Sequence, residues 1–354
     1  MPMPPLPSPV HTQLSETDQA ALIDLYVRGT PENTLRAYER DLLYITHWRR
    51  LVFGADLVWP EREEVALRFI LDHARDLNAA EPTDSARIAG EALIAAGLRK
   101  SLTCPAPAPA PATLDRRIAS WQAFHRMKNL TSPFEAPMLR QARAKARRAA
   151  ARPRAPKSAK PIIRDVLEQM LESCGHDMRG TRDRAILMLG WASGGRRRSE
   201  LSGLRREDLS LEEFEAKGLI WIYLLQTKTT GREATPRLVL KGRAAKAVVT
   251  WIRVAEIGDD PLFRPISKSG RPLPRPLSAD GIYQIVKHRL KRAGLPPEMA
   301  SPHGLRSGFL TQAALDGAPA QAAMRLSLHR SMAQAQRYYD DVDIAENPAT
   351  DLLG

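Results

Sequence analysis

Six side chains in the second half of the chain are of types that together could act on a phosphodiester. They are two arginines, one lysine, two histidines and one tyrosine: Arg197, Lys228, His303, Arg306, His329 and Tyr338. Planar guanidiniums match the non-bridging oxygens of a phosphate and counter the charge that grows as a nucleophile adds. An imidazole can relay protons near neutral pH, and a lysine can protonate a leaving oxygen. A tyrosine, with a free pKa of about 10, attacks as a phenolate only among cationic neighbours.

Each of these residues also has a purely structural explanation when it is taken alone. Arg197 could pair with an acidic neighbour on a helix surface, and Lys228 could be a solvated loop lysine. His329 could be a hydrogen-bonded core residue. The adjacent Tyr338 and Tyr339 could both serve only in packing. The functional interpretation therefore depends on the six residues occurring together and in this order.

The two neighbouring tyrosines can be separated by helical geometry. On a helix that begins near Ser331, Met332, Ala335 and Tyr339 lie on one stripe at i, i+3 and i+7. Tyr338 points about 100° away from that stripe. We therefore expect Tyr339 in the core and Tyr338 free to reach a ligand.

The first two candidates lie at predicted loops. The stretch "GGRRRSEL" places Arg197 after a glycine pair and three residues before Glu200. Lys228 lies in the polar loop "QTKTTGREATP" between strands predicted at 219–225 and 237–240.

The next two candidates lie at the start of a predicted helix. An amphipathic helix is expected over 278–295, and another follows with Ser301 as N-cap and Pro302 at its first position. His303 and Arg306 are one turn apart in this second helix. Its N-terminal N–H groups and positive dipole end would favour a bound anion.

The first 130 residues show helical periodicity almost throughout. The clearest helix has Thr30 as N-cap and Pro31 at its first position. Further amphipathic stretches cover 62–78 and 84–98. The stretch "CPAPAPAPAT" at 104–113 is predicted as an extended polyproline connector, after which helical periodicity resumes.

A basic segment follows this helical region. Residues 136–164 carry ten Lys or Arg and no acidic residue. Their first half is Ala-rich and predicts a helix, and their second half is broken by prolines. We expect this segment to lie on a phosphate backbone. Its candidate DNA-binding residues are Arg140, Arg143, Lys145, Arg147, Arg148, Arg152, Arg154, Lys157 and Lys160.

Composition limits the class of protein. The 354 residues include 53 Lys and Arg against 40 Asp and Glu, a net charge of +13 that favours a polyanionic partner. The alternatives at this point are a ribosomal-type or membrane-surface protein, or simply a basic protein. Two cysteines cannot form a disulfide framework, and no apolar run approaches the length of a membrane span. We expect a cytoplasmic, nucleoid-associated protein without cofactor or metal. The nearest metal-ligand pattern is "CGHD" at 174–177.

The domain organisation follows from these patterns. We predict a disordered lead-in, a helical DNA-binding domain that includes the connector, a basic linker, and a catalytic domain with a C-terminal tail: 1–14, 15–150, 151–161 and 162–354. The fold class is mainly α with a small antiparallel β-sheet in the second domain.

The six residues, in their order and spacing, resemble the catalytic set of the tyrosine recombinases, or phage-integrase family. Arg-x-x-Glu, His-x-x-Arg and a His-to-Tyr spacing of nine residues all match that family's pattern. The resemblance covers the second domain closely. It extends more loosely to the first domain, where "TPENTLRAYERDL" looks like the start of the family's core-binding domain. One departure is Leu328, where the family usually has Gly before the histidine. Because three arginines are consecutive at 196–198, the choice of Arg197 depends on the Arg-x-x-Glu register, and a shift by one residue would select Arg196 or Arg198.

The resemblance implies a mechanism and partners. Tyr338 would attack the scissile phosphate to give a 3′-phosphotyrosyl bond and a free 5′-hydroxyl, without ATP. Arg197 and Arg306 would hold the non-bridging oxygens with help from His329. Lys228 would protonate the leaving oxygen. His303 would take or relay the tyrosine proton, and Glu200 would support the cluster.

By resemblance, the protein is a site-specific DNA recombinase or integrase of a mobile element. It would act as a homotetramer on DNA through a Holliday junction, with or without an accessory directionality factor. Two alternatives remain open on the sequence. One is a type IB topoisomerase-like or resolvase activity without exchange between two sites. The other is a non-catalytic DNA-binding protein of the same fold.

Overall fold

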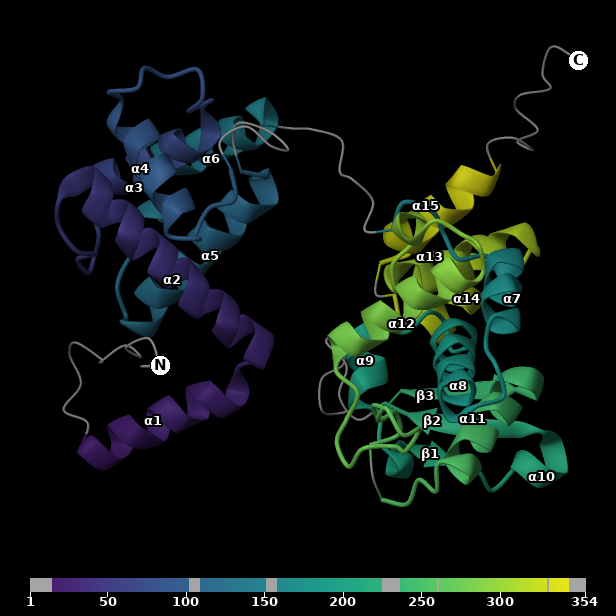
Figure 1. The fold of residues 1–354 in the computed structure, drawn as a ribbon. Helices are drawn as coiled ribbons and strands as arrows, with labels where there is room; N and C mark the ends of the chain where they lie inside the picture. Colours follow the sequence, from purple (N-terminus) through teal and green to yellow (C-terminus); the bar gives the residue numbers. More distant parts are fainter. Residues whose placement is uncertain are drawn as a thin grey trace, which may run out of the picture. The chain divides into compact units, whose positions relative to one another are not determined.

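The chain forms two compact units, within Met1–Pro153 and Arg154–Gly354, each described by itself below (Figure 1). The computed structural model describes residues 15–101, 109–150, 158–224, 236–259, 261–329 and 331–343. Among these residues no helix is long and apolar enough to cross a membrane.

The described part of the N-terminal unit is helical. Its elements are α1 (Glu16–Gly29), α2 (Glu32–Phe53), α3 (Glu63–Ala74), α4 (Ser85–Ala95), α5 (Pro111–Met127), the 3₁₀ turn η1 (Pro133–Glu135) and α6 (Pro137–Ala149). Aromatic side chains hold it together: the Phe69 ring lies edge-on to Trp48 and Trp121, with centroids 4.9 and 5.4 Å apart. Tyr44 adds a buried hydrogen bond between its hydroxyl and His73 Nε2, 2.7 Å long.

Two predictions for this unit were wrong in detail. Thr30 ends α1, and Pro31 is the N-cap of α2, so that helix begins one residue later than predicted. The predicted extended connector 104–113 ends early, because Pro111 starts α5. Proline is tolerated in a first helical turn, where its missing N–H would have no intrahelical partner.

The C-terminal unit combines helices with a small sheet. Its elements are α7 (Arg164–Glu172), α8 (Met178–Ala192), α9 (Arg198–Gly203), η2 (Arg206–Asp208), β1 (Leu209–Ser210), α10 (Phe214–Lys217), β2 (Leu219–Tyr223), β3 (Arg237–Lys241), α11 (Gly242–Val254), α12 (Ala279–Arg292), η3 (Pro297–Met299), α13 (His303–Leu315), α14 (Ala320–Ser327) and α15 (Met332–Asp343). The fold-class prediction is confirmed: the described residues are mainly helical with one small antiparallel sheet.

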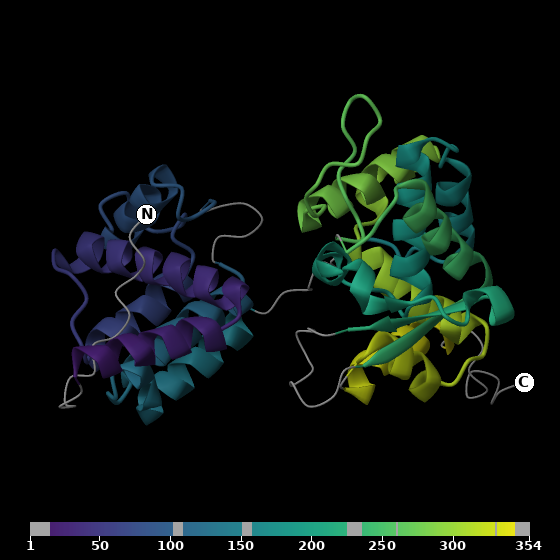
Figure 2. The same cartoon turned by 90° about the horizontal axis from the view of Figure 1, so that it is seen from below.

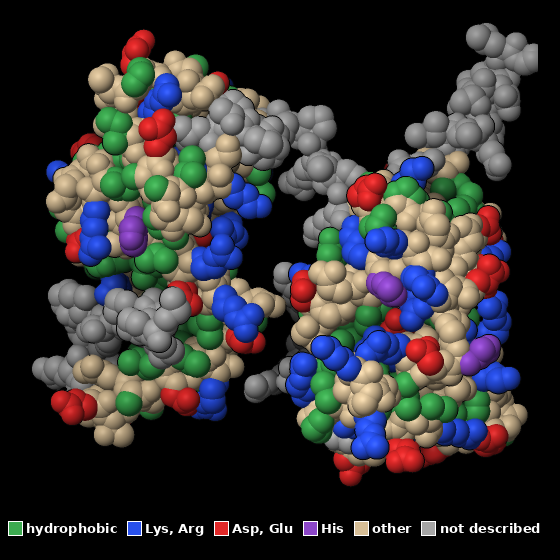
Figure 3. All heavy atoms as spheres, in the orientation of Figure 1, with side chains coloured by type: hydrophobic (Ala, Val, Ile, Leu, Met, Phe, Trp, Pro, Cys, Tyr) green, Lys and Arg blue, Asp and Glu red, His purple; other side chains and the backbone are tan. Residues whose placement is uncertain are grey.

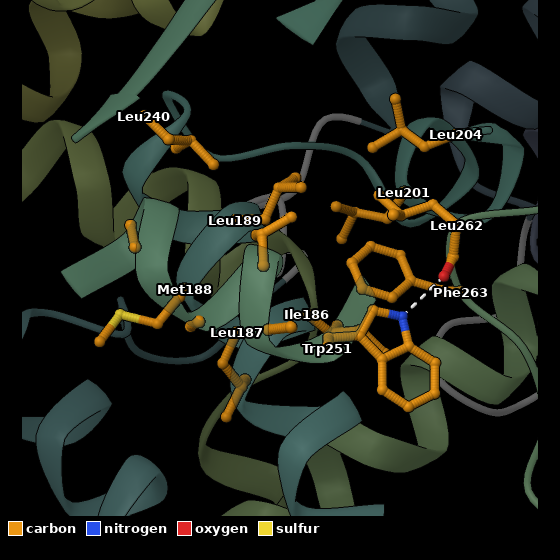
Figure 4. Packing of buried hydrophobic residues seen from close by; sticks show 14 of the residues in the cluster. Ile186, Leu187, Met188, Leu189, Leu201, Leu204, Leu240, Trp251, Leu262 and Phe263 are labelled. Carbon is orange, nitrogen blue, oxygen red and sulfur yellow. Dashed lines mark hydrogen bonds between the residues drawn. The ribbon is translucent and has the colours of Figure 1, made fainter. Parts of the chain in front are cut away.

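The core of this unit surrounds α8. Ile186, Leu187 and Leu189 are fully buried, as expected for a helix that is apolar on several faces. Figure 4 shows them near Trp251, whose indole N–H donates to the Leu262 carbonyl over 2.7 Å. In Figure 1 the sheet lies toward one end of the unit and α13 to α15 toward the other; Figure 2 views the unit from the end where the sheet lies.

The sheet has the order β1-β2-β3 with antiparallel pairs, and Trp221 of β2 faces Val239 of β3. The predicted strand at 219–225 ends at Tyr223, and β1 was not predicted. A two-residue strand carries no periodicity that a sequence pattern could reveal. The loop with Lys228 lies outside the described residues.

Candidate active site

Five of the six predicted catalytic residues line one cleft of about 970 Å³ in the C-terminal unit. Arg197 is the N-cap of α9, His303 and Arg306 belong to α13, His329 follows α14, and Tyr338 is on α15. The sixth, Lys228, lies outside the described residues. Figure 3 shows Lys, Arg and His side chains gathered on one face of this unit.

A glycine pair lets the first segment of the cleft approach the others. Gly194 and Gly195 have φ of +94° and +73°, a left-handed conformation that other residues adopt at a cost. A Cβ on Gly194 would lie 2.3 Å from the Leu326 carbonyl carbon. A Cβ on Gly195 would lie 2.2 Å from the Arg306 Cα. The pair therefore brings the loop before α9 into backbone contact with α13 and α14.

Glu200 holds Arg197 in place from within the same turn. One carboxylate oxygen accepts from the Arg197 backbone N–H at 3.0 Å, and the other accepts from the Arg197 Nη1 at 2.6 Å. The carboxylate is nearly buried, whereas the Arg197 side chain is 34% exposed toward the cleft. The pair thus fixes the guanidinium while leaving donors for a ligand.

Arg306 and His329 lie side by side at the floor of the cleft. Arg306 Nη1 donates to the Gly195 carbonyl at 3.1 Å, and its Nε lies 3.4 Å from His329 Nε2. The other ring nitrogen of His329 lies 2.8 Å from the Ser327 hydroxyl. This nitrogen also lies 3.3 Å from Arg306 Nη2, so the guanidinium contacts both ring nitrogens of His329 and Ser327 contacts one.

This arrangement keeps the histidine neutral. Burial, and then the charge of Arg306, lowers the pKa of His329 from 6.5 to about 4. Burial likewise lowers the pKa of Arg306 to about 10, so that residue stays cationic at neutral pH. The site thus combines a permanent cation with an uncharged imidazole.

The two tyrosines of α15 face different ways. Tyr339 is 7% exposed and packs with Leu310 and Ala323, as the helical stripe predicted. Met332, predicted on the same stripe, is exposed because it lies in the first turn of α15. Tyr338 lines the cleft with its ring centroid 6.4 Å from that of His329. Burial raises the pKa of Tyr338, and Arg306 offsets this only in part.

His303 is the first residue of α13, one position later than the predicted helix start. Pro302 is the N-cap, and Ser301 precedes the helix but still accepts from the His303 backbone N–H at 3.3 Å. The imidazole lines the cleft at the positive end of the helix.

Leu328 occupies the junction between α14 and His329. It has φ +54° and ψ +40°, the left-handed conformation that closes many helices and favours glycine. Its side chain packs against the main hydrophobic core of the unit. Backbone strain at this junction is thus opposed by apolar packing.

Several further residues line the cleft besides the five predicted catalytic ones. They are Arg196, Arg198, Ser199, Tyr283, Ser301, Pro302, Gln334 and Arg337. Arg337 had one available signal, because it directly precedes Tyr338. Tyr283 had none, since it comes from α12, which carries no predicted catalytic residue.

Some basic side chains of the predicted DNA-binding segment are already paired with an acidic residue of the protein. Arg143 and Arg147 of α6 both pair with Asp115 of α5, at 2.6 and 3.2 Å, whereas Arg140, Lys145 and Arg148 are exposed. Lys160, which belongs to the C-terminal unit, is exposed, and its backbone N–H donates to the Met299 carbonyl over 2.8 Å. The remaining candidates lie outside the described residues: Arg152, Arg154 and Lys157.

The N-terminal unit has a second basic cleft, of about 470 Å³, between α2 and α5. Arg36, Arg40, Arg116 and Arg117 line it together with Asp41. Arg116 is paired with Asp41 and Arg36 with Glu32. The Arg117 guanidinium is stacked 3.2 Å from the centre of the Tyr44 ring. These arginines are dispersed over two helices, so no basic run in the sequence marks the cleft.

The "CGHD" stretch does not form a metal site in the structure. Asp177 caps α8 by accepting from the Gly180 N–H at 2.9 Å, and burial raises the pKa of Cys174 to about 11. Among the residues that the structure describes, no three His, Cys, Asp or Glu side chains are grouped as metal ligands.

The fold and the cleft together define a catalytic domain of the tyrosine recombinase type. Residues 161–343 match the model of the phage integrase family, and the chain belongs to that family. It is 27% identical over 333 residues to an integrase/recombinase XerD homologue of Selenomonas ruminantium, covering 92% of this chain and 86% of that protein. It is 32% identical over 172 residues to the tyrosine recombinase XerD of Xanthomonas axonopodis pv. citri, covering 45% of this chain and half of that protein.

Solved structures show the same fold. The Tn1549 transposon integrase in complex with transposon right end DNA has a TM-score of 0.55 at 16% identity, covering 95% of this chain and 99% of that one. The XerH recombinase bound to its difH substrate has a TM-score of 0.54 at 16% identity, covering 95% and 86%.

Proposed function

We propose that this protein is a site-specific DNA recombinase that cuts and rejoins duplex DNA through a 3′-phosphotyrosyl intermediate. The observation that carries the proposal is that Arg197, Arg306, His329 and Tyr338 line one cleft. His303, the first residue of α13, lines it too. These residues come from four separate elements, so packing of a single helix does not account for their meeting.

The cleft suits a scissile phosphate. Arg197 and Arg306 present guanidinium donors to the two non-bridging oxygens, and His329 adds a hydrogen bond. A phosphate that binds here replaces the repulsion between these neighbouring cations with attraction. Binding and transition-state stabilisation therefore draw on the same side chains.

Cleavage forms one bond and breaks one bond. The Tyr338 oxygen adds to phosphorus as its proton passes to His303, and the bond from phosphorus to the 5′ oxygen breaks. Lys228 supplies the proton that this oxygen needs to leave as a hydroxyl. A 5′-hydroxyl reverses the steps and releases Tyr338. The phosphodiester energy stays in the intermediate, so ATP is not required. The cationic side chains supply the charge that a metal ion would otherwise provide.

The state of Tyr338 in the DNA-free site supports a need for a base. Its pKa is raised by burial, so the phenol is protonated at neutral pH. His303 lies at the N-terminus of α13 on the same cleft and is the base we assign.

The N-terminal unit would bind the phosphates of the duplex with its own Arg and Lys side chains. Exposed Arg140, Lys145 and Arg148 of α6 and the basic cleft between α2 and α5 offer two such surfaces. The relatives are named Xer recombinases, and two structural neighbours hold DNA. By analogy, four protomers would exchange strands through a Holliday junction in the nucleoid, with or without an accessory directionality factor.

A nicked suicide duplex built from DNA that flanks the gene tests the proposal. The full chain should form a covalent protein–DNA complex that Tyr338→Phe does not form. Exchange between two such sites identifies a recombinase; covalent trapping with relaxation but no exchange identifies a type IB topoisomerase-like or resolvase activity. DNA binding that Tyr338→Phe leaves intact, with no covalent complex from either protein, identifies a non-catalytic DNA-binding protein.

A further inference from the structure

Arg196, the residue before Arg197, is buried and bridges two segments of the active site. Its side chain is 1% exposed. Its Nη2 donates to the Leu326 carbonyl at 2.6 Å, and its Nη1 lies 3.7 Å from Glu200 Oε2. Its backbone N–H donates to the Gly190 carbonyl of α8 at 2.7 Å. The guanidinium therefore ties the loop before α9 to the end of α14.

The Leu326 carbonyl, which accepts the hydrogen bond from Arg196, lies three residues before His329 in the chain. It belongs to the last turn of α14, whose carbonyls have no intrahelical partner. Two residues later Leu328 turns left-handed, and His329 follows at the cleft. An anchor on Leu326 thus restricts the direction in which the chain delivers His329.

Burying a guanidinium at this position costs more free energy than burying an apolar side chain would. Nε and Nη1 of Arg196 have no hydrogen-bond partner among the described residues, and burial lowers the pKa of Arg196 to about 10. An apolar side chain would fill the same volume without that desolvation. What it could not supply is a directed donor to the Leu326 carbonyl.

We infer that Arg196 is a positioning residue for His329, acting through its hydrogen bond to the end of α14. The inference rests on the proposed cleavage reaction, in which His329 contacts the scissile phosphate. It assigns different tasks to neighbouring arginines: Arg197 binds the phosphate, and Arg196 orients another residue that does.

A double-mutant cycle tests this inference on the full chain. The first-order rate of covalent complex formation is measured on a saturating suicide duplex for Arg196→Met, His329→Ala and the double variant. Alone, Arg196→Met should lower the rate about 10- to 100-fold, with DNA affinity nearly unchanged. In the His329→Ala background the same change should lower it less than about 3-fold, because the residue it positions is gone. Arg196→Lys, which keeps a donor, should recover part of the rate.

Arg289 provides a matched control. It is a buried arginine of α12 that donates to the Ser173 carbonyl and to Asp183, away from the cleft. Arg289→Met should destabilise the protein, and its effect should be independent of His329→Ala. Independent effects of Arg196→Met and His329→Ala would overturn the inference, as would coupling of Arg196→Met to Arg197→Ala instead. Should Arg196→Met fail to fold, the same cycle is run with Arg196→Lys. Its effect on the rate should again be smaller in the His329→Ala background, and an equal effect in both backgrounds would overturn the inference. Absence of any covalent complex from the unmodified protein would instead refute the proposed function itself.

Discussion

Gly195 and Arg306, which are 111 residues apart in the chain, touch at the centre of the cleft. Arg306 Nη1 donates to the Gly195 carbonyl at 3.1 Å, and no Cβ could be added to Gly195 without overlapping the Arg306 Cα. Arg306, which we propose as a phosphate-binding arginine, is thus oriented by the backbone of the loop that carries Arg197. The two arginines are positioned as one unit.

Gly195→Ala should therefore abolish cleavage and destabilise the protein by about 3 kcal/mol or more, since strain and overlap act together. Urea unfolding and the suicide-substrate assay measure the two effects. Gly203→Ala is the control, because a Cβ there meets no atom within 4 Å. It should leave cleavage intact, and a normal cleavage rate for Gly195→Ala would contradict the contact.

Tyr339→Phe should keep cleavage activity. Its ring packs with Leu310 and Ala323 beneath the cleft, so losing the hydroxyl should change stability by no more than about 1–2 kcal/mol. The rate of covalent complex formation and the urea midpoint are the measurements. Loss of cleavage here, with retention in Tyr338→Phe, would reverse the assignment of the nucleophile.

At residue 328 a glycine variant should be more stable than an alanine variant, which reverses the order found inside an ordinary helix. Both substitutions lose the packing of the leucine against the core, but only glycine relieves the left-handed backbone strain at φ +54°. Leu328→Ala should therefore be less stable than Leu328→Gly by about 1 kcal/mol. In an ordinary helix the order is the opposite, and finding that order would show that residue 328 is not left-handed.

His329 should make stability depend on pH. The unfolded chain binds a proton at this residue as the pH falls through 6.5, whereas the folded protein resists protonation until about pH 4. The contribution of His329 to the free energy of unfolding is thus fully present above pH 6.5 and declines toward pH 4. The difference in stability between the unmodified protein and His329→Gln should shrink over that range. A difference constant from pH 7 to pH 4 would contradict the lowered pKa.

Arg40 tests the basic cleft of the N-terminal unit. Arg40→Gln should weaken DNA binding at all sequences. It should also reduce the slope of the logarithm of the binding constant against the logarithm of the salt concentration by about one, as loss of one phosphate contact predicts. Arg87→Gln, on α4 and paired with Glu91, is the matched control and should change neither. Equal effects of the two variants would indicate only a general loss of charge.

The sequence by itself determined the helical class, the family and the order of the candidate catalytic residues, because periodicity and residue spacing are local properties of the chain. It also separated Tyr338 from Tyr339, since one turn of helix decides their directions. Only the tertiary structure decided what Arg196 does, why residues 194 and 195 must be glycine, and which basic residues of α6 are already paired with Asp115. Those facts depend on contacts between segments about 30 to 130 residues apart, and such contacts leave no mark on local pattern.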